Sequence, residues 1–567
     1  MTQDQTAASF AAEAYRPRMH YTAADTWIND PNGLVYADGV YHLFFQNNPY
    51  GTDHENMSWG HAVSPDLIRW RDRPVAILCD ENEAIFSGSA VVDHGNTGGF
   101  GEPGSVPLVA IYTSHYTDGS PSAGIEAQSL AYSVDGGETW RKHEGNPVLD
   151  RGSSDFRDPK VFRYSSASGG YWVMVAVEAV DRKVVLYRSD NLKDWTYLSE
   201  FTSSAPVGKI WECPDLFPLP VDGDSDHMKW VLIVNINLEP GERGSEGLFF
   251  VGDFDGVTFT ALGGRESFHS GQPEWERLDY GRDFYATVSF NDAPEGRRVL
   301  IGWMSNWEYA RTLPTFPWRG AMTLPREASL HTADGRIVLR QRAVAGLAPA
   351  GPVRSRGLTD IPAGTHPLGL AWGEEPCLIE ATFDVGTSSE FGILLREGGA
   401  EATRIAYDTE RGALVVDRTA SGRADLGPAF ASKETAPVEL VGGRLALQVY
   451  VDASSVEVFA QGGRVTITDL IYPDPSSTGI SLHSAGGTAQ LISLTLTPLE
   501  DAPIERTDAE PQDGGPQSGE PQDGELQDGE LQDGEPQDRE PQDGEPEDGG
   551  RRGRESRRRL SRSRASA

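Results

Sequence analysis

Three acidic residues stand in short motifs that are unusual for surface carboxylates. Asp30 lies in WINDPNG (27–33), Asp158 in FRDP (156–159) and Glu212 in WECPD (211–215). Each acid follows an aromatic residue by one to three positions and precedes a proline by one or two. Two carboxylates held about 5–5.5 Å apart suit retaining glycoside hydrolysis, in which one is the nucleophile and the other the general acid and base.

Each motif taken alone also has a plain structural explanation. Asp-Pro-Asn-Gly is a common turn, because proline fixes φ and Asn-Gly tolerates positive φ. Arg157 and Asp158 could form a surface ion pair, and WECPD could simply end a strand. What favours catalysis is the occurrence of all three motifs in one strand-rich part of the chain.

Neighbouring residues predict how two of these acids are tuned. Trp211 and Pro214 would desolvate Glu212 and raise its pKa, as a general acid at neutral pH requires. Arg157 would act in the opposite direction on Asp158, keeping this carboxylate ionised and able to bind hydroxyl groups.

Composition argues against several classes of protein. The formal net charge of −36 over 567 residues argues against nucleic acid or an anionic membrane surface as a partner. Three widely spaced cysteines (79, 213 and 377) form neither a disulfide framework nor a zinc motif, so no metal and no other cofactor is expected. No apolar stretch reaches the length of a membrane helix. The first residues lack a basic and apolar leader, so we expect a cytoplasmic protein unless a misplaced start codon hides a secretion signal.

Strands must position the acids, because residues 16–335 consist almost wholly of short apolar alternations separated by Gly, Asp and Asn turns. A weak repeat is visible in SPDLIRW at 64–70, SVDGGETW at 133–140 and SDNLKDW at 189–195. Its spacing predicts propeller blades, roughly five over this length. The innermost strand of each blade would bring the acids to a central funnel.

The rest of the chain divides into two further parts and a short N-terminal extension (1–15). Residues 345–498 alternate as hairpins without helical periodicity, which predicts a two-sheet β-sandwich. Residues 501–567 repeat Glu-Pro/Leu-Gln-Asp-Gly and then become rich in arginine, and with few apolar residues they are expected to be disordered. The predicted fold class is therefore all-β, with a propeller, a sandwich and a disordered C-terminal tail.

These motifs resemble those of glycoside hydrolase family 32, the invertases, inulinases and levanases, over about residues 16–498. The resemblance also includes YHLFFQ (41–46), SWGHA (58–62), IGWMSNW (301–307) and VDASSVEVF (451–459). It implies a five-bladed β-propeller at 16–335 followed by the sandwich. The sandwich would brace the propeller, and contact between two copies of the chain is an additional option for it.

The resemblance also implies a role for each acid. Asp30 would attack C2 of a terminal β-fructosyl unit, Glu212 would protonate the departing oxygen and later activate water, and Asp158 would hold sugar hydroxyls and stabilise the transition state. Eight further residues would shape the fructose pocket: Asn29, Gln46, His54, Trp59, Phe86, Ser87, Arg157 and Trp303. His54 and Glu55 stand where many relatives carry Trp-Gly, so His54 would have to replace an indole unless the change is compensated elsewhere.

The predicted function is that of a retaining exo-β-fructosidase acting on fructans (levan or inulin), fructo-oligosaccharides and sucrose. The runs at 90–100 and 314–326 resemble the levanase and exo-inulinase branch of the family. A fructosyltransferase, such as a levan fructotransferase, would use the same three acids, whereas a fructan-binding lectin would have lost one of them. The preference for β-2,1 or β-2,6 linkages stays open, and so does the oligomeric state, with a homodimer as one option.

Overall fold

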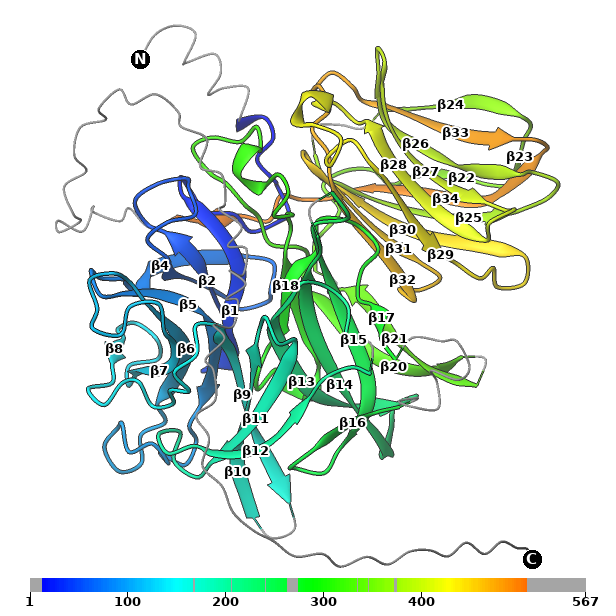
Figure 1. The fold of residues 1–567 in the computed structure, drawn as a ribbon. Helices are drawn as coiled ribbons and strands as arrows, with labels where there is room; N and C mark the ends of the chain where they lie inside the picture. The colour runs from blue at the N-terminus through cyan, green and yellow to red at the C-terminus, as the bar shows by residue number, and fades with distance from the viewer. Residues whose placement is uncertain are drawn as a thin grey trace, which may run out of the picture. The chain divides into compact units, whose positions relative to one another are not determined.

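The computed structural model describes residues 13–166, 169–204, 206–239, 241–262, 274–333, 335–344, 346–371 and 375–506. Their secondary structure is nearly all strand, interrupted by the short 3₁₀ turns η1 (Pro294–Gly296), η2 (Ala310–Thr312) and η3 (Ala424–Leu426), so the all-β prediction is confirmed (Figure 1). No helix in this described part is long and apolar enough to cross a membrane. Most of the N-terminal extension lies outside the described residues, and so does most of the tail at 501–567, for which we expected disorder.

Five blades of four antiparallel strands follow one another along the first part of the described chain. Their inner strands, β1, β5, β9, β13 and β18, lie next to one another in a ring (Figure 1). The blades are β1 (Trp27–Ala37), β2 (Val40–Asn48), β3 (Ser58–Ser64) and β4 (Trp70–Ile77); β5 (Glu83–Val92), β6 (Leu108–Tyr116), β7 (Glu126–Ser133) and β8 (Arg141–Lys142); β9 (Phe156–Ser166), β10 (Gly169–Glu178), β11 (Lys183–Ser189) and β12 (Thr196–Phe201); β13 (Ile210–Val221), β14 (Asp224–Asn237), β15 (Ser245–Phe254) and β16 (Phe259–Ala261); and β18 (Tyr285–Ser289), β19 (Val299–Trp303), β20 (Arg326–Ala333) and β21 (Arg336–Ala343). Two short strands join this framework, β17 (Glu276–Arg277) on β15 and β35 (Ile504–Glu505) on β4.

Each blade buries both of its faces, which explains the continuous apolar runs in the sequence. Successive side chains of a strand point to opposite faces. In β10, Val175 and Val177 therefore pack toward the fourth blade with Leu232, while Met174 and Ala176 pack toward the second blade. The ring closes through a further buried cluster that joins the first and fifth blades.

The weak sequence repeat marks the same turn in three successive blades. Ser64, Ser133 and Ser189 each end the third strand of a blade, and each hydroxyl bonds to an Asp or Asn side chain two residues later. Short side chains that bond to their own backbone or near neighbours favour such turns. The sequence repeat therefore marks successive propeller blades, as predicted.

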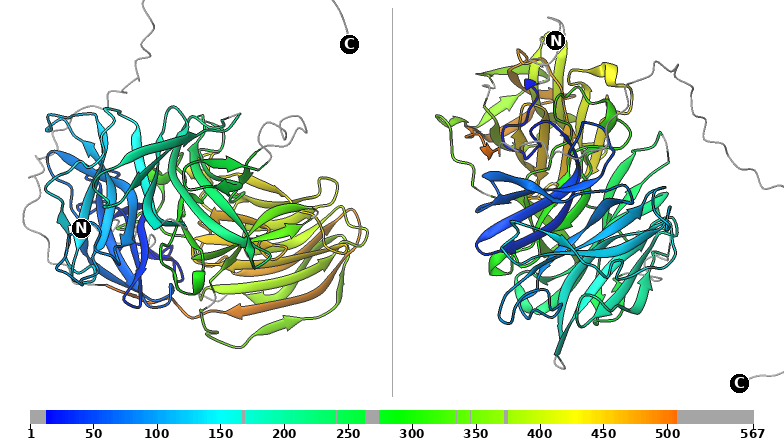
Figure 2. Two further views of the ribbon diagram at one scale, coloured as in Figure 1. Left: turned by 90° about the horizontal axis from the view of Figure 1, so that it is seen from below. Right: turned by 90° about the vertical axis from the view of Figure 1, so that its left-hand side faces the viewer.

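The remaining strands form the sandwich, with seven strands in one sheet and six in the other (Figure 2). The first sheet contains β22 (Arg354–Arg356), β23 (Thr359–Ile361), β25 (Cys377–Asp384), β30 (Arg444–Val451), β31 (Ser455–Ala460), β32 (Val465–Leu470) and β34 (Ala489–Pro498). The second contains β24 (Gly364–Ala371), β26 (Glu390–Gly398), β27 (Glu401–Asp408), β28 (Ala413–Ala420), β29 (Lys433–Pro437) and β33 (Gly479–Ala485). Their facing side chains, including Ile379, Phe391 and Val449, make one buried apolar core.

Buried charges attach the sandwich to the propeller. His20 places Nδ1 2.8 Å from Asp452 and Nε2 2.8 Å from Glu457. Arg326 of β20 also bonds to Glu457, 2.5 Å away, and to Asp279 at 2.8 Å. Because all of these side chains are buried, removing one partner would leave an uncompensated charge in the interior. Asp452 and Glu457 belong to the VDASSVEVF motif of the sandwich. This motif therefore braces the propeller, as expected from the sequence.

Candidate active site

The inner strands bring the three predicted acids to one cavity of about 460 Å³. Asp30, Asp158 and Glu212 lie near the start of β1, β9 and β13, and the pairing of each strand with its neighbour shifts register there. Asp158 has a positive φ of 62°, and so does Cys213 with 43°. Such bulges redirect side chains and are frequent beside active sites. The bulges therefore turn the acids toward the cavity.

Asp30 is held by donors from its own motif and from the neighbouring blade. The Trp27 indole N–H donates to Asn29 Oδ1 at 2.8 Å, which turns Asn29 Nδ2 toward Asp30 at 3.0 Å. Ser87 Oγ donates to the other carboxylate oxygen at 2.8 Å. Burial raises the pKa of Asp30, while these hydrogen bonds act to lower it. The WIND sequence thus builds a fixed, partly desolvated carboxylate.

The pKa of Asp158 differs from the value expected from its neighbour Arg157. Its Oδ2 accepts a hydrogen bond from the Cys213 backbone N–H at 2.9 Å. Burial raises the pKa of Asp158 to about 8 and outweighs the opposing charge of Arg157. The prediction that Arg157 dominates the pKa of Asp158 is therefore wrong, because burial has the larger effect. A protonated carboxyl group at this position can donate a hydrogen bond as well as accept one.

Glu212 accepts hydrogen bonds on both oxygens. Arg157 Nη2 donates to Oε1 at 3.2 Å, while Asn237 Nδ2 and the Tyr285 hydroxyl donate to Oε2 at 2.8 and 2.5 Å. Trp211 is fully buried on the opposite face of β13, where its indole N–H bonds to the Val207 carbonyl. Strand alternation thus removes Trp211 from the surroundings of Glu212, contrary to the sequence interpretation.

Most of the predicted binding residues line the same cavity. Its lining includes Asn29, Gln46, His54, Phe86, Ser87 and Arg157 together with the three acids. Trp59 and Trp303 are fully buried and lie outside this lining. Trp59 donates its indole N–H to the Phe86 carbonyl, and Trp303 packs against Trp27 and Trp307. Both therefore support residues that face the cavity.

Four lining residues were missed by sequence reasoning: Glu126, Asn237, Trp307 and Arg311. Glu126 begins β7 and accepts a 3.0 Å hydrogen bond from Arg157, so one guanidinium group links two glutamates. Asn237 ends β14. Neither stands in a distinctive motif, so only the strand pairing could have placed them.

His54 lines the cavity and packs against two indole rings. Its ring makes edge contacts with Trp27 at 5.7 Å and with Trp307 at 5.0 Å between ring centroids. Burial, helped by the Arg311 charge, lowers the pKa of His54 to about 4, so the ring is neutral at neutral pH. A neutral imidazole thus stands here as a small aromatic surface with polar nitrogens.

The site contains one thiol and no cluster of metal-binding side chains. Cys213 Sγ lies 3.5 Å from Asp30 Oδ2, and burial raises the pKa of the Cys213 thiol well above its usual value. A protonated thiol of this kind is a poor nucleophile, so Cys213 serves here as a small neighbour of Asp30. Across the described residues no group of three or more His, Cys, Asp or Glu side chains could hold a metal ion.

Comparison with known proteins places this geometry in a family context. The model of the glycosyl hydrolases family 32 N-terminal domain matches residues 20–341, and the model of that family's C-terminal domain matches residues 363–498. A levanase of Bacillus subtilis (strain 168) is 45% identical over 506 residues, covering 88% of this chain and 72% of the levanase. An extracellular exo-inulinase of Aspergillus awamori is 38% identical over 507 residues, covering 84% and 93%. The crystal structure of the Aspergillus awamori exo-inulinase superposes with a TM-score of 0.81 at 37% identity, covering 86% of this chain and 99% of the exo-inulinase chain.

Proposed function

The chain belongs to glycosyl hydrolase family 32, and we propose that it is a retaining exo-β-fructosidase acting on fructans and fructo-oligosaccharides. The observation that carries the proposal is the convergence of Asp30, Asp158 and Glu212 in one cavity. The names of its relatives, levanase and exo-inulinase, support fructans as the substrate class.

In the proposed first step, a terminal fructosyl unit enters the cavity and Asp30 attacks its C2. Departure of the leaving oxygen creates positive charge at C2, which the Asp30 carboxylate stabilises and then traps as an ester. Glu212 gives its proton to the departing oxygen, so the leaving group is released as a neutral hydroxyl.

In the second step, Glu212 takes a proton from water, and the oxygen of that water attacks C2 while the bond to Asp30 breaks. The two displacements together retain configuration at C2. Asp158, whose pKa burial raises, forms a hydrogen bond with a sugar hydroxyl and accepts one from the Cys213 N–H. Its part is to orient the ring rather than to form a bond to it.

The leaving group would lie toward His54, Trp307 and Arg311 at the cavity wall. Aromatic faces and a neutral imidazole suit an uncharged sugar. Since these contacts belong to the second sugar of the substrate, they would influence which linkage and chain length are preferred. The cytoplasmic location expected from the sequence stays a prediction, and so does the oligomeric state.

A product assay tests the proposal. The purified protein is incubated with sucrose, kestose, inulin and levan, and the products are separated by anion-exchange chromatography. Free fructose released from chain ends, and lost in both Asp30→Ala and Glu212→Ala variants, is the expected result. Cyclic or longer fructosides would instead assign a transferase, and unchanged activity in either variant would overturn the assigned roles.

A further inference from the structure

A second cavity of about 490 Å³ lies on the same inner strands as the candidate active site but farther along them. Ser87, Asp158 and Glu212 face the first cavity, while Val92, Tyr164 and Pro218, five or six positions later on the same strands, face the second. At a rise of about 3.3 Å per residue, the two cavities are separated by roughly 17–20 Å. They are the two mouths of the central funnel of the propeller.

The space between the mouths is filled. Lys160 and Asp215 are buried there with 3.1 Å between Nζ and the carboxylate, and the remaining gap beside Lys160 is about 10 Å³. Such a space holds at most one water molecule. A sugar therefore cannot pass from one cavity to the other, and the second cavity is a separate site.

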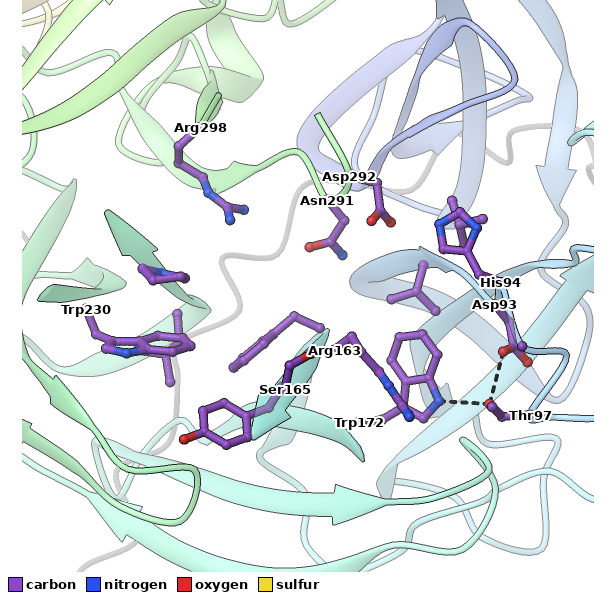
Figure 3. Close-up of a pocket in the computed structure, with 17 residues that line it drawn as sticks. Asp93, His94, Thr97, Arg163, Ser165, Trp172, Trp230, Asn291, Asp292 and Arg298 are labelled. Atoms are coloured by element: carbon purple, nitrogen blue, oxygen red, sulfur yellow. Dashed lines mark hydrogen bonds between the residues drawn. The ribbon is translucent and has the colours of Figure 1, made fainter. Parts of the chain in front are cut away.

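Two groups of opposite charge face this second cavity without forming an ion pair with each other (Figure 3). Nη1 of Arg298 donates to Ser289 Oγ and to the Phe290 carbonyl, but its Nε is buried without a hydrogen-bond partner. Burial lowers the pKa of Arg298 and raises the pKa of Asp292. Arg298 thus keeps a guanidinium N–H without a polar partner, whereas the exposed Asp292 carboxylate can accept hydrogen bonds from a ligand in the cavity.

Aromatic rings form the opposite wall. Trp230 and Trp172 line the cavity together with Phe162 and Tyr164 (Figure 3). Arg163 lies over the Trp172 ring at 5.1 Å and donates to the Gly170 carbonyl, so its charge is already engaged. Trp230 packs against Phe162 and Tyr164 and supplies a flat apolar surface beside the charged groups.

We propose that this second cavity binds a neutral sugar, a fructosyl unit of the substrate, at a non-catalytic site formed by Arg298, Asp292 and Trp230. A sugar ring offers both hydroxyl donors, which suit the Asp292 carboxylate, and hydroxyl acceptors, which suit the Arg298 guanidinium group. Its apolar face suits the indole. A small anion fits less well, because it would meet the Asp292 carboxylate. The volume lies in the range of small-molecule pockets.

This inference rests on the proposed function, since the sugar that it assigns is the proposed substrate. It is tested by calorimetric titration of the full-length Glu212→Gln variant, which hydrolyses slowly, with kestose. Two binding sites are expected. Adding Asp292→Gly should weaken the second site at least about tenfold, because hydrogen bonds to a charged group are lost. Glycine is chosen because Asp292 has a φ of 55°.

A matched control is Asp38→Gly, which removes an exposed carboxylate at a similar φ of 49° and lines neither cavity. It should leave both sites intact. If Asp292→Gly fails to fold, Arg298→Lys, which keeps the charge but removes the planar guanidinium group, should weaken the same site. A single site in the Glu212→Gln protein overturns the inference, as does displacement of kestose from the second site by inorganic phosphate. Hydrolysis of kestose by the wild type, measured in parallel, keeps the proposed function standing in that case, whereas no hydrolysis by the wild type overturns the function itself.

Discussion

The buried contact between His20 and two sandwich carboxylates predicts a particular pH dependence of stability. Burial alone would lower the pKa of His20, but hydrogen bonds to Asp452 and Glu457 outweigh burial and raise it to about 9. Both contacts are 2.8 Å long, and all three side chains are fully buried. The imidazole is therefore charged at neutral pH and holds together two parts of the fold.

The size of this effect follows from the shift. The folded-state pKa is higher than the unfolded value of about 6.5, so the folded protein binds the proton more tightly. The resulting stabilisation is fully present below about pH 6.5 and is lost as the pH rises through 9. A difference of about 2.5 pKa units corresponds to about 3 kcal/mol.

The test compares the wild type with His20→Asn in urea titrations followed by tryptophan fluorescence. The variant cannot carry the charge, so its loss in free energy of unfolding should be about 3 kcal/mol larger near pH 6 than near pH 9.5. Titration of Asp158 changes the stability of both proteins alike and cancels in the difference. His366→Asn, at a half-buried histidine of the sandwich, is the control and should show no such trend. A loss for His20→Asn that stays constant across this pH range would refute the reasoning.

Two substitutions test the surroundings of the acids. Tyr285→Phe removes the 2.5 Å hydrogen bond to Glu212 and should lower kcat/KM about 10- to 100-fold. The control Tyr309→Phe removes a buried hydrogen bond between a tyrosine and a carboxylate outside the cavity, and it should leave kcat/KM unchanged. Equal losses of kcat/KM in the two variants would contradict a role for the Tyr285 hydrogen bond. Ser87→Ala removes a hydrogen bond that lowers the pKa of Asp30, so the acid limb of the pH profile of kcat/KM should move to higher pH. An unmoved or downward-shifted limb would show that Asp30 does not control it.

The sequence predicted the parts of the fold that depend on local patterns. The Ser-Asx turns and the apolar alternation at 16–335 are set by neighbouring residues, and they led to blades. The motif acids were also predictable, because each sits on an inner strand where bulges occur. Asp30 is the clearest case, since Trp27 and Asn29 position it from within its own motif.

What the sequence could not supply depends on pairing between distant strands. Asn237 reaches the cavity because β14 pairs with the inner strand β13, and Glu126 reaches it from the third strand of its blade, through pairing with β6. No local signal marks either residue. The state of Asp158 was mispredicted because adjacency to Arg157 suggested an ion pair, while burial, which only the fold shows, outweighs that charge. The sequence interpretation wrongly placed the Trp211 side chain beside Glu212, because strand alternation turns Trp211 toward the opposite face of β13.

The most direct test of the account is to trap the covalent intermediate. Full-length Glu212→Ala protein is mixed with β-fructofuranosyl fluoride, whose leaving group needs no proton, and is then digested and analysed by mass spectrometry. Without the general base the fructosyl-enzyme should accumulate, and the peptide containing residues 27–33 should carry one fructosyl group on Asp30. A fructosyl group on Asp158, or turnover of the fluoride with no labelled peptide, would contradict the assignment of Asp30 as the nucleophile.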